Sequence, residues 1–379
     1  MRDVIVVGAG PAGSYASYSL SRMGYDVLNL EEHREVGKPV ECTGLVSARV
    51  TGMVKTRSGV NTVTGAHVIF PNGERIHVHK KEKTIVLDRD SFDKDCAGQS
   101  IGAGTDLRID SRVRSVKVTE DSATVVYREM GTLREETARI VIGADGLNSR
   151  VRRDLFGTRS SRIISAYQVD SAAKLEDQDS VEVYVGSKVT RGFFGWATPS
   201  GNITRIGVGA HGGASLKYFN NLNAKFGQNK ILGINGGGIP IAYLKKTYAD
   251  RSLLVGDAAG IVKPLSGGGI YTGMVSAKHA ADAVNTAFER EDFSEKTLSM
   301  YEKGWKSDLR SELWFDGMFQ RFFSMISDGA FNRIYSMISD PVAIEKINEV
   351  GDIDYPSRVI ISLILRKPGL LRNLLPGRI

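Results

Sequence analysis

The sequence predicts an α/β protein, α+β overall, with a parallel-sheet domain, an antiparallel-sheet domain and a helical C-terminal region. Three observations support this prediction. The chain opens on a β-branched run that leads into a glycine-rich turn, and two similar runs recur around residues 140–146 and 252–260. Residues 160–246 alternate between short apolar runs and turn residues, and the chain from about residue 293 onward has helical periodicity. At 379 residues the chain is too long for one compact core.

The first motif is a strand, a glycine-rich turn and a helix. Val4–Val7 is typical of a strand buried in a parallel sheet, and Gly8-Ala9-Gly10-Pro11-Ala12-Gly13 follows it directly. In this pattern one glycine forms the tight turn, one lets a pyrophosphate approach the backbone, and one lets the helix pack on the strand. Ser14–Met23 is the expected helix, whose N-terminus offers free N–H groups to phosphates.

A carboxylate completes this motif at the expected distance. Asp26–Leu30 predicts the second strand, and Glu31 closes it, where its carboxylate can accept both hydroxyls of a ribose. A lone Gly-x-Gly-x-x-Gly is weak evidence. The preceding strand, the following helix and the acidic residue together predict a Rossmann-like dinucleotide site.

Two later segments favour FAD over a nicotinamide nucleotide. Ile140–Gly146 reads as another buried strand that enters a glycine turn, followed by Ser149 and two arginines. Ser252–Gly260 is a third such run, with Asp257 at the carboxyl end of its strand. Because ligands of open α/β sheets bind at those ends, Asp257 is placed to hydrogen-bond a ribityl hydroxyl.

These segments resemble the para-hydroxybenzoate hydroxylase-like FAD superfamily. More narrowly, the sequence resembles the geranylgeranyl reductase family, including the archaeal digeranylgeranylglycerophospholipid reductases, over residues 1 to about 290. Four local matches carry the resemblance: Lys38–Gly44, Leu87–Asp93, Phe194–Pro199 and Pro264–Ile270. Phe194 stands where that family has Tyr, and Thr198 stands where it has Phe.

The resemblance implies a set of site residues. Those expected to bind FAD are Gly8, Gly10, Ala12, Gly13, Glu31, Cys42, Thr43, Leu45, Arg89, Val113, Asp257, Gly267, Gly268, Gly269 and Ile270. Trp196 and Pro199 are expected to bind substrate. The glycine run has no side chains, so its N–H groups can approach the flavin ring and stabilise charge on it.

We expect three domains. Residues 1–58, 82–156 and 247–290 form the FAD-binding domain, with a β-meander inserted between Arg112 and Ile142. Residues 59–81 and 157–246 form the antiparallel sheet that walls a substrate chamber, and residues 291–379 form the helical region.

The amino-acid composition limits the cellular compartment and the kinds of partner that we expect. Cys42 and Cys96 are the only cysteines, which favours a reducing compartment. His77 and His79 share one face of an expected strand, but two ligands make a poor metal site, so we expect no metal. The net charge of +7 favours anionic partners or reflects a basic surface without a partner. We expect no nucleic-acid partner, no signal peptide and no membrane span.

The C-terminal region has two features with alternative interpretations. Residues 305–326 are rich in aromatic residues and Met, and they either line a tunnel for an isoprenoid chain or form ordinary helix core. The tail, Val359–Ile379, mixes Ile and Leu with basic residues, and it either rests on an anionic membrane surface or packs as a last helix. We therefore expect a cytoplasmic protein with peripheral contact to the inner face of the membrane.

The resemblance implies FAD-dependent reduction of isolated C=C bonds in the geranylgeranyl chains of a prenyl lipid. One alkene carbon receives a hydride and the other receives a proton. Cys42 is the first candidate for the proton donor, or else a small buried apolar residue, and Tyr271 is the second. Ferredoxin and NADPH both stay open as the electron donor.

Two alternatives belong to other functional classes. One is a flavin monooxygenase or halogenase, against which Tyr271 and the Trp196–Pro199 segment count. The other is a non-catalytic prenyl-binding protein, against which the intact flavin motifs count.

Overall fold

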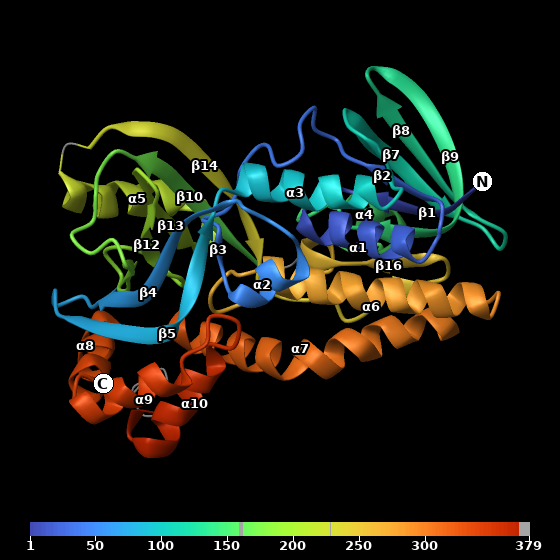
Figure 1. Cartoon of the computed structure of the whole chain (residues 1–379). Coiled ribbons are helices and arrows are strands. Elements are labelled where there is room, and N and C mark those ends of the chain that lie inside the picture. Colours follow the sequence, from blue (N-terminus) through green and yellow to red (C-terminus); the bar gives the residue numbers. More distant parts are fainter. Residues whose placement is uncertain (159–161, 228, 371–379) are drawn as a thin grey trace.

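Two sheets lie side by side, and helices cover them, in the computed structural model of the chain (Figure 1). The structure describes residues 1–158, 162–227 and 229–370. The first sheet lies at the right of Figure 1 and the second at the left, while α6 and α7 run along the lower side. The helices α8, α9 and α10 lie below the strands β4 and β5 of the second sheet.

The first sheet has the parallel arrangement expected of a dinucleotide fold. Its main path runs β15-β16-β9-β1-β2-β6, and the pairs β16/β9, β9/β1, β1/β2 and β2/β6 are parallel. The helices α3, α1 and α6 lie next to one another across one face of this sheet. The bounds are β1 Arg2–Val7, β2 Val27–Leu30, β6 Asp106–Arg108, β9 Thr132–Gly143, β15 Tyr248–Ala249, β16 Ser252–Leu254, α1 Pro11–Arg22, α3 Arg89–Gly102 and α6 Ile270–Glu289.

The expected β-meander is confirmed. β7 (Ser111–Val118) pairs with β8 (Ala123–Glu129), which pairs with the first part of β9, and both pairs are antiparallel. The end of β9 then joins the parallel sheet beside β1. α4 (Arg150–Phe156) follows β9 and packs near β7.

The second sheet is mostly antiparallel and has the strand order β14-β10-β13-β12-β11-β4-β5-β3. One of its faces packs against α5 through residues such as Ile206, Phe219 and Leu222. The bounds are β3 Leu45–Val46, β4 Gly59–Ile69, β5 Arg75–Leu87, β10 Ile163–Ser171, β11 Ser180–Tyr184, β12 Gly195–Ser200, β13 Ile203–Ala210, β14 Ile231–Pro240, α2 Ala48–Met53 and α5 Ser215–Asn223.

The C-terminal region is helical, as expected. α7 (Glu295–Phe323) packs along α6, and Trp305, Leu309 and Leu313 belong to the core of the first sheet. α8 (Asp328–Ile338), α9 (Pro341–Val350) and α10 (Ser357–Arg366) pack on β4 and β5. None of the described helices combines the length and the apolarity that a membrane crossing requires.

The two sheets suggest where the domains meet. β5 continues to Leu87 within the second sheet, and β3 also belongs to that sheet. We propose the division expected from the sequence, except that residues 45–46 and 82–87, expected in the FAD-binding domain, are strands of the second sheet.

Candidate functional site

The turn after β1 is shaped by close backbone approaches. Gly8 has φ +100°, and a Cβ atom there would lie 2.5 Å from the carbonyl oxygen of Ala144. A Cβ atom on Gly13 would lie 2.0 Å from the carbonyl oxygen of Gly8. At Gly10, by contrast, a Cβ atom would meet nothing within 4 Å. Gly8 and Gly13 are thus required for packing, whereas Gly10 borders open space before α1, where a pyrophosphate could approach.

Glu31 lies at the end of β2 and faces this turn. Its Oε2 atom accepts a hydrogen bond from the backbone N–H of Ala9 at 2.8 Å, and its Oε1 atom contacts the backbone N and the Nδ1 of His33. The Glu31 residue is buried. Its carboxylate is therefore held at the edge of the glycine turn, as a ribose ligand would require.

Asp257 follows β16 and has an unsatisfied carboxylate. Its side chain has no hydrogen-bond or ion-pair partner among the described residues, and its Oδ1 atom lies 2.9 Å from where a Cβ of Gly269 would be. Burial raises the pKa of Asp257 to about 6, with Arg89 lowering it and Glu41 raising it. A half-buried carboxylate of this kind is stabilised by a hydrogen-bond donor, and a sugar hydroxyl would supply one.

Arg89 connects the expected pyrophosphate end of the site to the Cys42 loop. It begins α3 and forms a bidentate pair with Asp93 at 3.0 and 2.9 Å. Burial alone would lower the pKa of Arg89, but Asp93 and the nearby Cys42 raise it. The Cys42 thiol itself accepts a hydrogen bond from the backbone N–H of Gly44 at 3.3 Å.

The glycine run before α6 lies against both Asp257 and an apolar wall. A Cβ atom on Gly267 would lie 3.2 Å from Ile239 Cδ1 and 3.3 Å from Phe193 Cζ. Gly269 caps α6 without a side chain, so the first N–H groups of this helix stay free of a cap. Backbone donors and aromatic surface therefore meet at one place.

The two residues expected to bind substrate do not share a face. Trp196 and Pro199 lie three residues apart on β12, so their side chains point to opposite sides of the second sheet. Trp196 Nε1 donates to Gln168 Oε1 at 2.9 Å, and Thr43 donates to the same oxygen at 2.6 Å. The buried Gln168 Nε2 has no hydrogen-bond partner among the described residues. Trp196 thus lies on the side of the Cys42 loop, and Pro199 does not.

Val113 and Leu45 occupy other parts of the fold. Val113 is buried on β7, two residues after Ser111, whose backbone N–H bonds the carbonyl oxygen of Glu31. Leu45 begins β3, next to the Cys42 loop. Ile270 is the first residue of α6 and packs with the cluster around Val46 and Phe92.

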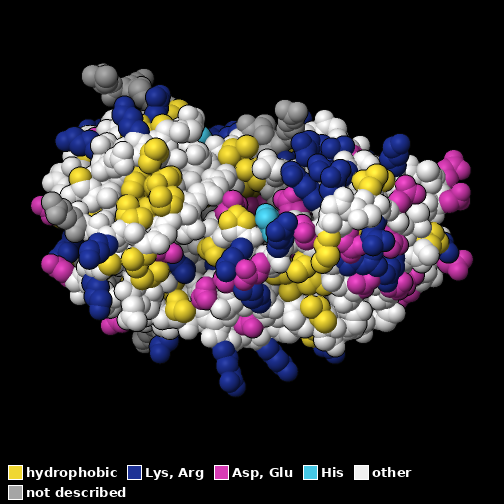
Figure 2. All heavy atoms as spheres, turned by 90° about the horizontal axis from the view of Figure 1, so that it is seen from above, with side chains coloured by type: hydrophobic (Ala, Val, Ile, Leu, Met, Phe, Trp, Pro, Cys, Tyr) yellow, Lys and Arg dark blue, Asp and Glu magenta, His cyan; other side chains and the backbone are white. Residues whose placement is uncertain are grey.

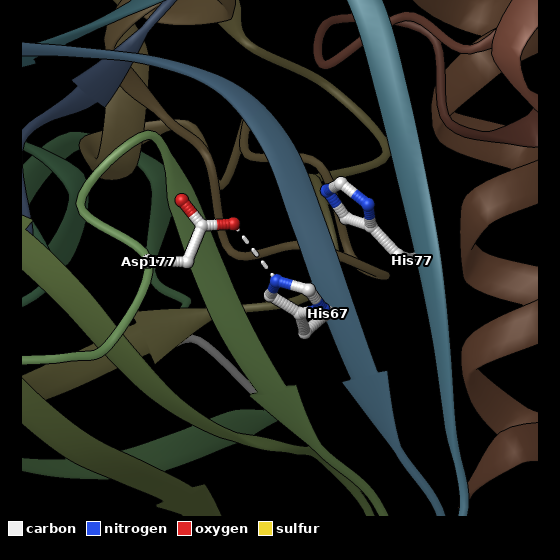
Figure 3. Close-up of side chains that lie close together, drawn as sticks. All are labelled: His67, His77 and Asp177. Carbon is white, nitrogen blue, oxygen red and sulfur yellow. Dashed lines mark hydrogen bonds and ion pairs between the residues drawn. The ribbon is translucent and has the colours of Figure 1, made fainter.

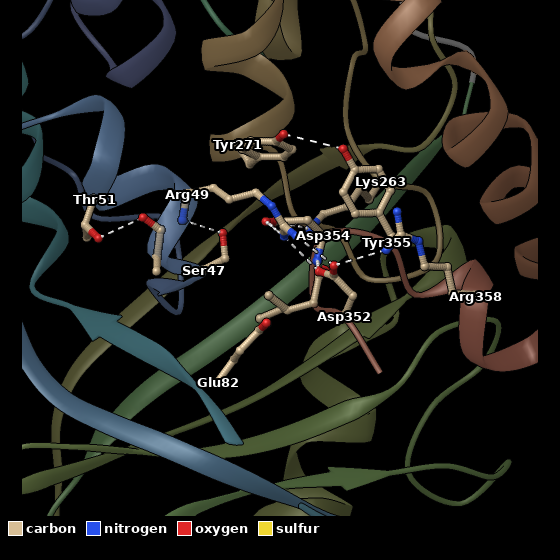
Figure 4. Close-up of polar contacts among 12 residues, drawn as sticks. Ser47, Arg49, Thr51, Glu82, Lys263, Tyr271, Asp352, Asp354, Tyr355 and Arg358 are labelled. Carbon is tan, nitrogen blue, oxygen red and sulfur yellow. Dashed lines mark hydrogen bonds and ion pairs between the residues drawn. The ribbon is translucent and has the colours of Figure 1, made fainter. Parts of the chain in front are cut away.

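A buried cluster of charges lies beneath the glycine run, and sequence reasoning missed it (Figure 4). The Lys263 ammonium donates to the carbonyl oxygen of Ile353 at 2.7 Å and pairs with Asp354 Oδ1 at 3.1 Å. Arg49 pairs with Asp354 Oδ2 at 3.0 Å and with Asp352 at 2.9 Å. A lysine within the apolar run 261–265 was a signal that a buried anion would be needed.

Asp316 lies close to this cluster, and neither of its carboxylate oxygens has a hydrogen-bond partner in the part of the chain that the structure describes. Burial raises its pKa to about 8, Glu312 raises it further, and Lys263 opposes the shift. The Glu312 carboxylate accepts from the backbone N–H and the hydroxyl of Ser357 at 2.9 and 2.6 Å. The sequence signal for this arrangement was the spacing of Glu312 and Asp316, two acidic residues about one helical turn apart in a segment rich in aromatic residues.

Tyr271, a candidate proton donor, is half-buried on the first turn of α6. Its hydroxyl lies 3.4 Å from that of Tyr355, and burial followed by this contact raises the pKa of Tyr271. The guanidinium of Arg358 stacks 4.5 Å from the ring of Tyr355. Cys42 and Tyr271 therefore belong to different neighbourhoods of the site.

Among the described residues, one His and Asp group has the composition of a cation site, on the second sheet (Figure 3). His67 Nε2 lies 2.9 Å from Asp177 Oδ2, and the rings of His67 and His77 stack at 4.3 Å with 18° between their planes. Hydrogen bonds from Ser180 and His67 lower the pKa of Asp177 to about 2. Parallel rings do not direct their nitrogen lone pairs toward one point, so we assign no metal here.

Comparison with known proteins agrees with this geometry. A family model described as FAD binding domain matches residues 1–304. A digeranylgeranylglycerophospholipid reductase of Methanococcus vannielii is 32% identical over 322 residues, which are 80% of this chain and 82% of that protein. The crystal structure of a geranylgeranyl bacteriochlorophyll reductase-like protein from Thermoplasma acidophilum has a TM-score of 0.88 at 25% identity and covers 99% of both chains.

A flavin-dependent brominase has a TM-score of 0.71 at 16% identity, covering 97% of this chain and 100% of that chain, which shows the fold alone. The fold and the FAD-domain match define the class of the protein: it is an FAD-dependent oxidoreductase. Within that class, the chain belongs to the geranylgeranyl reductase family.

Proposed function

We propose that the protein reduces isolated C=C bonds in the geranylgeranyl chains of a prenyl lipid, a digeranylgeranylglyceryl phospholipid or geranylgeranyl diphosphate, in membrane lipid synthesis. The observation that carries this proposal is the apolar wall at the glycine run. Phe193 and Ile239 contact Gly267, and Phe193 stacks on Phe194 with ring centroids 4.3 Å apart. An uncharged alkene is the type of substrate that such a wall accommodates.

The proposal assigns the cofactor contacts as follows. Gly10 and the first turn of α1, with Ala12 and Gly13, bind the pyrophosphate, and Glu31 binds the adenosine ribose. Asp257 binds the ribityl chain, because its half-buried carboxylate has no partner among the described residues. Arg89 and Val113 border the nucleotide. The open space at Gly10 and the unsatisfied Asp257 are what support the fit of FAD to these residues.

The flavin ring is assigned to the space bordered by the Cys42 loop and the glycine run. Cys42, Thr43 and Leu45 would border one side of it, and residues 267–270 the other. The bound FAD supplies hydride transfer to carbon. The free N–H groups at the start of α6 would stabilise negative charge there, because the helix dipole is positive at that end.

The chain must also supply a proton and exclude water. Cys42 is the first candidate donor, because it lies on the loop that Thr43 fixes through Gln168 to Trp196. Tyr271 is the second candidate, next to Ile270 at the start of α6. The buried aromatic residues Phe193 and Trp196 keep the neighbouring space dry.

One experiment distinguishes the proposed alkene reduction from a monooxygenase reaction. The purified flavoprotein is reduced anaerobically with dithionite and mixed with digeranylgeranylglyceryl phosphate. We expect flavin reoxidation without oxygen and a product heavier by about 2 Da for each reduced bond. A flavin that stays reduced until air enters, with oxygen then found in the product, would identify a monooxygenase. Reoxidation by neither route would favour a prenyl-binding protein without catalysis.

The electron donor is tested in the same system. Reduced ferredoxin and NADPH are each supplied in place of dithionite, and the rate of flavin bleaching is compared. Reduction of an alkene consumes two electrons per bond, and we propose that one of these two donors supplies them.

A further inference from the structure

The outer face of α7 carries a continuous stripe of exposed side chains. Met300, Lys303, Ser307, Arg310, Trp314 and Arg321 are all exposed and recur at spacings of three, four or seven residues, so they share one side of the helix. Trp314 is 55% exposed, which is unusual for a side chain of this size. We define these six residues as the α7 stripe.

The cations of the α7 stripe have no counter-ions. Lys303, Arg310 and Arg321 form no ion pair or side-chain hydrogen bond with any residue that the structure describes. Two acidic residues of the same helix that lie near the stripe in sequence, Glu302 and Asp308, are engaged elsewhere. Asp308 bonds His279 at 2.8 Å, and Glu302 bonds Thr247 and Lys306. The stripe therefore presents net positive charge to solvent.

A shallow hollow of about 420 Å³ lies in the middle of the stripe. It is lined by Lys306, Ser307, Arg310, Ser311, Trp314 and Phe315. The hydroxyls of Ser307 and Ser311 donate to no described residue, and the rings of Trp314 and Phe315 meet edge to face at 4.9 Å. Cations, hydroxyls and aromatic rings together match a phosphate group at the surface of an apolar phase.

We propose that the α7 stripe docks the protein on an anionic lipid bilayer, with Trp314 at the interface between headgroups and acyl chains. Lys303 and Arg321 are about 27 Å apart along a straight helix, so the charge is spread along a line that suits a flat surface. Exposed Trp flanked by Lys and Arg is typical of interfacial helices. A lipid substrate, which is part of the proposed function, would require such docking.

Exposed residues elsewhere on the lower side of the molecule favour the same orientation on the bilayer. α10 lies on that side with α7 (Figure 1), and it exposes Arg358, Leu365 and Arg366. On the opposite face, over the half that holds the first sheet, Lys and Arg side chains lie together with Asp and Glu and also form one cluster of their own (Figure 2). Of the tail Val359–Ile379, for which membrane contact or packing as a last helix was expected, residues 359–366 pack as part of α10, and residues 371–379 lie outside the described residues.

Vesicle flotation tests the proposal. Full-length FAD-loaded protein is mixed with vesicles of phosphatidylcholine, with or without phosphatidylglycerol, and Arg310→Glu is compared with Arg114→Glu. Arg114 is an exposed cation on β7, on the opposite side of the molecule, and has no ion-pair partner among the described residues. We expect binding to anionic vesicles only, at least a tenfold weaker partition for Arg310→Glu, and no change for Arg114→Glu.

Tryptophan fluorescence gives a second test of contact between the α7 stripe and the membrane. Trp196 and Trp305 are buried, so brominated lipid should quench Trp314 alone, and Trp314→Phe should remove the quenching. The proposal is overturned if the wild type does not bind anionic vesicles, or if Arg310→Glu binds them as the wild type does. It is also overturned if Arg310→Glu weakens binding only to a small acidic electron-transfer protein. The flavin absorbance shows that each variant is folded, and reduction of detergent-dispersed lipid by the wild type tests the proposed function separately.

Discussion

Asp257 is the residue whose surroundings most directly support our assignment of the cofactor. Its carboxylate is half-buried, has no hydrogen-bond or ion-pair partner among the described residues, and is adjacent to Gly269. In the protein without cofactor, an ionised group in this position costs free energy, which is why burial raises its pKa to about 6. The same group becomes favourable once a hydroxyl donates to it.

Asp257→Ala should therefore have opposite effects on affinity and on stability. FAD affinity should fall at least about tenfold, because hydrogen bonds to charged groups contribute roughly 1.5–3 kcal/mol. The apo protein should become more stable at pH 7, because the half-buried charge is gone. Calorimetric titration and urea unfolding measure the two effects, with Asp121→Ala on an exposed turn as the control. A loss of apo stability without a loss of affinity would assign Asp257 a structural role.

Asp316 predicts a pH dependence of stability. Its pKa in the folded state is about 8, above the value of 3.8 for an unperturbed Asp, so the folded state binds more protons between these limits. Its contribution to stability is therefore fully present below about pH 4 and is lost as the pH rises toward 8. The expected slope is about 1.4 kcal/mol per pH unit for one proton.

Asp316→Asn should flatten this slope in urea unfolding measured from pH 5 to 8. Asp121→Asn, at an exposed position between β7 and β8 without an ion pair among the described residues, should leave the slope unchanged. Equal slopes in the wild type and in Asp316→Asn would show that Asp316 is ionised throughout this range.

At the scale of elements, the segment between α9 and α10 fastens the C-terminal helices to the side of the molecule that we assign to the flavin. Asp354 pairs with Lys263, which lies below the glycine run, and with Arg49 of α2. A Cβ atom on Gly268 would lie 2.7 Å from Lys263 Cε, so the lysine stem packs directly under that run. The residues 352–354 therefore support the glycine run from behind.

Asp354→Leu should destabilise the protein by roughly 3–5 kcal/mol, because it leaves the buried Lys263 ammonium without its counter-ion. The double variant Lys263→Met with Asp354→Leu should recover much of this loss. Glu349→Ala removes an exposed ion pair with Lys346 and should change stability by less than about 1 kcal/mol. Urea unfolding measures all three, and a loss below 1 kcal/mol for Asp354→Leu would contradict the supporting role.

The elements differ in how far the sequence could predict them. β1, the glycine turn and β2 were predictable because strand burial, turn geometry and the Glu31 carboxylate act within about 30 residues. The partnership of Lys263 with Asp354 was not, because it joins residues 91 positions apart. The opposite orientations of Trp196 and Pro199 follow from strand periodicity once β12 is assigned to residues 195–200.

At the scale of the whole molecule, the two sheets are joined at the Cys42 loop. Arg205 of β13 donates through Nη1 to the carbonyl oxygens of Thr43 at 2.6 Å and Leu87 at 2.8 Å. Thr43 also bonds Gln168 of β10. These contacts connect the second sheet to the loop that we assign to the flavin, so cofactor binding should order both sheets together.

Arg205→Met tests this connection. In the wild type, FAD at 100 times its Kd should add about 2.7 kcal/mol to the free energy of unfolding. The amides of β1 and β9 in the first sheet, and those of β10 and β13 in the second, should therefore exchange more slowly. In Arg205→Met, two buried carbonyls lose their donor, and FAD should protect the first sheet while leaving the second nearly unchanged. Arg205→Lys keeps the charge and should give an intermediate result. Equal protection of both sheets in Arg205→Met, measured by hydrogen exchange with mass spectrometry, would show that the sheets are coupled through other contacts.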